Sequence, residues 1–138
     1  MKITLRWLKS KSACPEGIAW FNAQKERDSK KLIVKLMAEK HFDWASWLIV
    51  QVMERPQYLA YTIYAAEQVI DIYEKKYPTD KRPRNAIEAV KKCLTDDSAE
   101  NRNAAADAAY AAYAAAAYAA VREEMQTKIL NYGLTLLK

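Results

Sequence analysis

The chain has 138 residues and a formal net charge of +5 at pH 7, with two glycines, two cysteines and one histidine. This length is typical of one domain, and so few glycines argue against hairpin-rich β folds and glycine-rich phosphate loops. We therefore expect an all-α fold, a compact bundle of six to eight helices that forms a single domain over residues 1–138.

The cellular setting is predicted from the cysteines and the N-terminus. Cys14 and Cys93 are far apart in sequence, and the opening MKITLRWLKSK lacks the apolar core of a signal peptide. Reduced thiols in the cytoplasm are the default for such a chain. The expectation is a cytoplasmic protein with no membrane partner.

Two short elements are predicted first. Thr4 is a suitable N-cap for a helix that begins at Leu5, although the alternation of apolar residues over 3–7 leaves a strand open. Pro15 is tolerated in the first turn of a helix, because its missing N–H would be unpaired there. A second brief helix is therefore expected from Pro15 through Phe21.

The next two helices follow from apolar spacing. From about Asp28 to Met37 the apolar residues recur at three and four, and lysines occupy other positions on the wheel. Residues 41–43 interrupt this pattern. Asp43 is then predicted to be the N-cap of a helix that ends before Pro56.

Prolines bound the fifth and sixth predicted helices. One helix runs from about Gln57 to Tyr77 and is stopped by Pro78. A charged link, 79–82, then leads through Pro83 into a helix with apolar residues at helical spacing. These residues are Ala86, Ile87, Val90, Cys93 and Leu94.

The most distinctive segment is 104–120, where 13 of 17 residues are alanine. Alanine is the best helix former, so this segment is predicted to be a helix, capped near 96–98. Tyr110 and Tyr113 share one face and alanines the opposite one, which is the pattern of a central helix in a bundle. A last helix is expected to follow, with a break at Gly133.

The residues offer little for catalysis. One histidine, His41, leaves a hydrolase triad or a multi-histidine metal site short of groups, and Cys14 has no CxxC partner. We expect no catalytic residues, no cofactor, no metal and no enzymatic activity. An enzyme that uses His41 stays open as an alternative.

Basic residues and tyrosines are the candidates for partner binding. The link and helix near residue 82 carry four cations, Arg82, Arg84, Lys91 and Lys92. Arg84 and Glu88 are spaced i to i+4, which favours a local salt bridge for that pair. The Ala-rich helix adds three further candidates, Asp107, Tyr110 and Tyr113. Asp107 suits either a hydrogen-bonded partner or the helix N-terminal dipole, and the tyrosines suit either core or interface.

Four segments together resemble a bacterial family of immunity proteins, whose members carry an Ala-rich helix after an RPR-A-IE link. They are TLRWLKSKSAC, DWASWL, DKRPRNAIE and ENRNAAADAAYAAYAAAAYAAVR, in that order along the chain. The resemblance implies a small cytoplasmic binding protein that neutralises a cognate toxin or effector by masking its active site. The chain departs from the family pattern in its lysine-rich stretch over 25–40 and in having no glycine in KSKSAC.

Other partners stay open. A phage-encoded inhibitor of a host defence or replication protein would differ from a toxin inhibitor only in its target. Nucleic acid could bind the basic clusters, including a second one of Lys25, Arg27, Lys30, Lys31 and Lys35. A homodimer could form through the alanine face.

Overall fold

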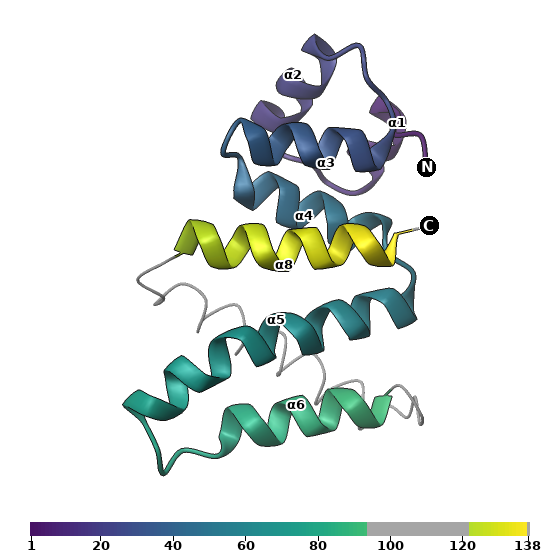
Figure 1. Ribbon diagram of the computed structural model, residues 1–138. Helices are drawn as coiled ribbons and strands as arrows, with labels where there is room; N and C mark the ends of the chain where they lie inside the picture. Colours follow the sequence, from purple (N-terminus) through teal and green to yellow (C-terminus); the bar gives the residue numbers. More distant parts are fainter. Residues whose placement is uncertain (94–121, 138) are drawn as a thin grey trace. The chain divides into compact units, whose positions relative to one another are not determined.

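A computed structural model describes residues 1–93 and 122–137, which form seven helices and no strand beyond an isolated bridge between Lys2 and Asp28 (Figure 1). The all-α prediction is therefore confirmed. The Ala-rich segment 104–120 and its predicted cap lie outside the described ranges. No helix within those ranges is both long and apolar enough to cross a membrane.

The chain divides into two units, residues 1–53 with Leu137 and residues 54–136, and each is described by itself. The first contains α1 (Leu5–Ser10), α2 (Pro15–Ala23), α3 (Ser29–Ala38) and α4 (Phe42–Val52). The second contains α5 (Arg55–Lys76), α6 (Arg82–Cys93) and α8 (Arg122–Leu136). A single domain over the whole chain stays a prediction.

Side-chain caps begin the first and third helices, and the cap at Thr4 is the one that the sequence predicts. The hydroxyl of Thr4 accepts a hydrogen bond of 3.1 Å from the amide of Trp7, so residues 5–10 are a helix rather than a strand. The carboxylate of Asp28 accepts one of 3.2 Å from the amide of Lys31. Each cap satisfies an N–H that has no partner inside its helix.

Left-handed residues end α1 and α3. Ser12 has φ 58° and Lys40 has φ 61°, and each follows directly after the C-cap of its helix. At the end of α1 the amide of Ala13 donates to the carbonyl of Leu8 over 3.0 Å. At the end of α3 the amide of His41 donates to the carbonyl of Leu36 over 2.8 Å. Both ends are Schellman motifs built without glycine.

The Schellman motif of α3 also corrects the predicted start of α4. The N-cap is His41, with no side-chain cap bond, and Asp43 lies inside the first turn. Because the chain turns sharply at Lys40, the helical conformation resumes two residues earlier than the Asp43 cap would require. In the first turn the Asp43 carboxylate still has a favourable interaction with the N-terminal helix dipole.

The core of the first unit lies where α3 and α4 pack together. Ile33 on α3 and Ile49 on α4 are fully buried, whereas the neighbouring Val34 is 53% exposed. This alternation of burial along α3 is the one that its apolar spacing predicts.

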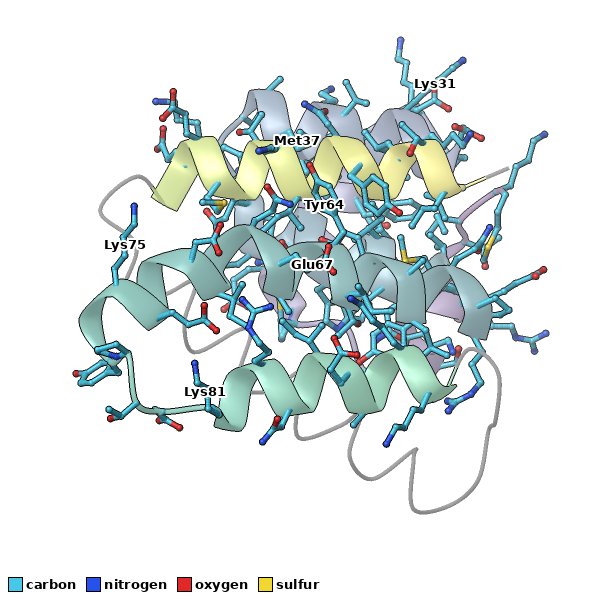
Figure 2. All side chains as sticks on the ribbon, turned by 60° about the horizontal axis from the view of Figure 1, so that its bottom comes forward. Lys31, Met37, Tyr64, Glu67, Lys75 and Lys81 are labelled. Carbon is cyan, nitrogen blue, oxygen red and sulfur yellow. The ribbon has the colours of Figure 1, made fainter. Side chains whose placement is uncertain are left out.

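In the second unit α5 packs against both α6 and α8 (Figure 1). Ala66 and Ile70 of α5 form a buried cluster with Ile87 of α6. On α8, the Tyr132 ring stacks on Tyr64, which Figure 2 labels. The three helices are thus held by two separate sets of contacts along α5.

The predicted break at Gly133 is wrong, because α8 continues through it to Leu136. Gly133 is buried, and no glycine in the described ranges has a positive φ. A mid-helix glycine costs about 1 kcal/mol relative to alanine. The neighbouring contacts offset that cost, since Leu130 is fully buried and Gln57 donates a 2.7 Å hydrogen bond to the Leu136 carbonyl.

Candidate functional site

The antiparallel helices α5 and α6 carry a band of paired charges. We call it the α5–α6 charged surface and define it by Glu67, Glu74, Arg84, Glu88 and Lys91. Glu74 of α5 pairs with Arg84 of α6, and Glu67 of α5 pairs with Lys91 of α6. The two pairs are thus separated by seven residues on each helix. Seven residues are about two helical turns, so the two acids share one face of α5 and the two bases share one face of α6. Ile70 and Ile87, which belong to the buried cluster, lie between the paired residues in the sequence.

The strongest pair joins Arg84 to Glu74. The guanidinium Nε and Nη2 donate to the two carboxylate oxygens over 2.6 and 2.9 Å, which is the bidentate geometry. This hydrogen bonding from Arg84 lowers the pKa of the Glu74 carboxyl below its ordinary value. The Arg84 side chain is half exposed, so the pair is available at the surface.

Lys91 is shared between two carboxylates. Its ammonium lies 3.2 Å from Glu67 on α5 and 3.5 Å from Glu88 one turn earlier on α6. The hydrogen bond with Glu67 is the main cause of the raised pKa of Lys91. All three side chains are exposed (Figure 2, where Glu67 is labelled).

The predicted binding residues are thus distributed unevenly. Arg84 and Lys91 belong to the charged surface, and Lys92 is exposed beside Lys91. Arg82 begins α6, but its side chain lies outside those described. Asp107, Tyr110 and Tyr113 also fall outside the described ranges.

The local salt bridge predicted for Arg84 and Glu88 is not the one formed. Arg84 pairs with Glu74 of the neighbouring helix, and Glu88 pairs with Lys91. The antiparallel register brings both oxygens of Glu74 to the guanidinium, and a bidentate contact is stronger than an i to i+4 pair on one helix. The sequence alone does not contain this register.

The tyrosines of α5 divide between core and edge. Tyr61 is 7% exposed, and burial raises its pKa to about 12. Tyr58 and Tyr64 are half-buried. Tyr61 is therefore a core residue rather than an exposed anchor for a partner.

A second feature, an apolar pocket in the first unit, is not predicted by the sequence. It has a volume of about 310 Å³ and is lined by residues of all four helices α1 to α4. Three of the residues that line it are tryptophans, namely Trp20, Trp44 and Trp47. Their helical spacing predicts burial, but the space left between the helices depends on how they pack.

Two of these indoles are fixed from outside the pocket. The Trp20 Nε1 donates a 2.6 Å hydrogen bond to Glu39, whose carboxylate also lies 3.9 Å from the Nε2 of His41. The His41 ring in turn stacks on Trp44, with centroids 4.5 Å apart. His41 thus has a structural setting between α3 and α4.

Within residues 1–93 and 122–137, no group of histidine, cysteine, aspartate and glutamate side chains is arranged to hold a metal ion. Cys14 is exposed, and its sulfur accepts from the amide of Gly17 over 3.4 Å as the N-cap of α2.

A known protein family matches the region of the chain that contains the α5–α6 charged surface. A family model described as "Imm-5 like putative immunity protein" matches residues 49–137, which is more than half of the chain. The chain belongs to this Imm-5 like family. No curated protein and no solved structure matches it.

The family match includes one of the two candidate features of this Imm-5 like protein and leaves out the other. It covers α5, α6 and α8 and therefore the whole α5–α6 charged surface. All residues that line the pocket lie before residue 49. The charged surface is thus the feature to consider for a role common to Imm-5 like proteins.

Proposed function

We propose that this Imm-5 like protein is a non-enzymatic inhibitor that binds a cognate toxin or effector protein through the α5–α6 charged surface. The observation that carries the proposal is the fixed alternation of carboxylates and cations on this surface, inside the matched region. Family membership supports an immunity role and a protein partner in general.

The geometry suits recognition of a protein. Arg84 and Lys91 are held by carboxylates of the neighbouring helix, so less side-chain freedom is lost when a partner binds. A pattern of both signs selects a complementary pattern and rejects like charges, which gives specificity. Exposed Lys92 adds a further cation beside the pairs.

The nucleic-acid alternative is less well supported. Phosphate binding depends on cations that can replace condensed counterions, and the cations of the charged surface already face carboxylates. In the other basic cluster, Arg27 donates to the carbonyls of Gln24 and Glu26 over 2.6 and 2.7 Å. Lys31 lies 3.6 Å from the Glu26 carboxylate.

The test uses the toxin or effector encoded beside the gene, purified and titrated against the full chain by calorimetry. The key variant is the double exchange Glu74→Arg with Arg84→Glu, which retains an ion pair between α5 and α6 but reverses the pattern presented to a partner. We expect at least about tenfold weaker binding, or 1.4 kcal/mol. Lys31→Glu on α3, outside the matched region, is the control and should bind normally.

Two results would overturn the proposal. One is an unchanged dissociation constant for the double exchange, with helicity and melting temperature also unchanged. The other is tight binding of duplex DNA whose affinity falls steeply with salt, which is the behaviour of a nucleic-acid binder. A phage-type inhibitor would behave like a toxin inhibitor in these assays, and only its target would differ.

A further inference from the structure

We propose that the pocket of the first unit is a binding site for a small, uncharged apolar molecule about the size of two fused aromatic rings. This inference depends on residues 1–48 and not on the proposed toxin contact. The lining residues on which this inference depends come from four helices. They are Leu8 of α1, Trp20 and Phe21 of α2, Leu36 of α3, and Trp44 and Trp47 of α4.

The volume sets the size of the ligand. Protein interiors are close-packed, and voids larger than a water molecule are few. An apolar cavity of roughly 150 Å³ stays dry and takes one benzene ring. The pocket, at about 310 Å³, has room for two fused rings.

The lining sets the polarity of the ligand. Apart from the indole N–H groups, the polar side chains at the pocket are those of Ser12, Cys14 and Asp43, and all three of these residues are exposed. A charged ligand would lose its hydration without buried partners to replace it. Flat indole walls suit a flat, neutral ring system.

The walls are held in place before any ligand arrives. Glu39 accepts from the Trp20 indole over 2.6 Å, and His41, 3.9 Å from the same carboxylate, stacks on Trp44. The indoles of α2 and α4 are thereby linked through the turn between α3 and α4. Glu39 and His41 are positioning residues, and a preformed site loses less entropy on binding.

The test is an NMR titration of the ¹⁵N-labelled full chain with 2-naphthol. The chain has four tryptophans, so four indole N–H signals are expected, assigned with single Trp→Phe variants. The signals of Trp20, Trp44 and Trp47 should shift together and saturate, whereas Trp7, which does not line the pocket, should shift least. The anion 2-naphthalenesulfonate, with the same rings, should leave the three pocket signals unchanged.

A matched pair of variants checks the position of the ligand. Ala13 lines the pocket, and Val34 is exposed on the same unit, so Ala13→Phe adds bulk inside and Val34→Phe adds it outside. We expect at least about tenfold weaker binding for the first and no change for the second. Glu39 is exposed, so if Ala13→Phe does not fold, Glu39→Ala should weaken binding and Glu39→Gln, which keeps an acceptor, should not.

Three outcomes would overturn the inference. The first is the absence of a saturable shift of the three pocket signals. The second is an equal loss of affinity in the Val34→Phe control. The third is a set of nuclear Overhauser contacts, without probe, between the pocket indoles and residues 94–121, since the chain itself would then fill the space.

Discussion

The ring of Tyr64 on α5 stacks on the ring of Tyr132 on α8, with centroids 3.9 Å apart and planes inclined by 17°. The two residues are far apart in sequence, so the stack closes a long loop of chain. It lies on α5 beside the buried cluster that joins α5 to α6. The packing of α8 on α5 thus has an aromatic contact of its own.

A double-mutant cycle should measure this stack. The coupling between Tyr64→Ala and Tyr132→Ala in the free energy of unfolding is expected to be about 0.5–1.5 kcal/mol. Tyr64→Phe keeps the ring and should retain the coupling. Strictly additive losses, measured by urea unfolding, would contradict a stabilising stack.

Alkaline pH should destabilise the protein through Tyr61. Burial raises the pKa of this phenol from 10.0 to about 12 in the folded state. The unfolded chain therefore releases its proton first, and the stability contributed by the neutral phenol is present below pH 10 and lost as pH rises towards 12. Tyr61→Phe should show a flatter loss of stability over this range, measured by denaturant unfolding at each pH. Parallel curves for the two proteins would contradict the raised pKa.

Neighbouring residues on α3 should differ sharply in their effect on stability. Ile33 is 0% exposed and Val34 is 53% exposed. Ile33→Ala leaves a cavity in the core and should cost about 2–5 kcal/mol, whereas Val34→Ala should stay within about 0.5 kcal/mol of the wild type. Thermal unfolding would show the difference, and similar melting temperatures would contradict this packing of α3.

Glycine should stabilise the end of α1. Ser12 has φ 58°, a conformation that costs a residue with a Cβ about 1 kcal/mol or more relative to glycine. Ser12→Gly is therefore expected to raise the free energy of unfolding by about 0.5–1 kcal/mol. Ser12→Ala is the control, because it removes the hydroxyl but keeps the strain. An increase for alanine as large as that for glycine would contradict the backbone explanation.

The pKa of Glu74 should depend on Arg84. Hydrogen bonds from the guanidinium lower it in the folded state, so the stability contributed by this pair is present above the ordinary glutamate pKa and lost as pH falls through the lower one. In Arg84→Ala the midpoint should rise towards the ordinary value, measured by carbon NMR of the side-chain carboxyl. Arg84→Lys, which cannot make the bidentate contact, should give an intermediate midpoint. An unchanged midpoint in Arg84→Ala would mean that another group lowers this pKa.

Local signals predicted much of the described fold. Thr4 is the predicted N-cap because a short side-chain acceptor suffices at a helix start, and Pro15 occupies the first turn that tolerates it. The start of α4 was misplaced because the chain turns at Lys40 without a glycine. The predicted break at Gly133 failed because tertiary contacts outweigh a modest local preference.

The candidate sites were less predictable. Arg84 and Lys91 stood out as basic residues, but their partners on α5 depend on the register between two helices. The pocket depends on three tryptophans from two helices that meet only in the folded unit. Periodicity indicates which face of a helix is buried, and it does not contain the distance to the neighbouring helix.

The ion pairs of α5 and α6 constrain how this sequence can diverge. Glu74 and Arg84 meet in a bidentate contact, so a reversal of charge at one position places like charges together unless the other reverses too. Covariation of these two positions is expected among homologues. Lys91 has carboxylates on both helices within 3.5 Å, so either Glu67 or Glu88 can drift during evolution while the lysine retains a counterion.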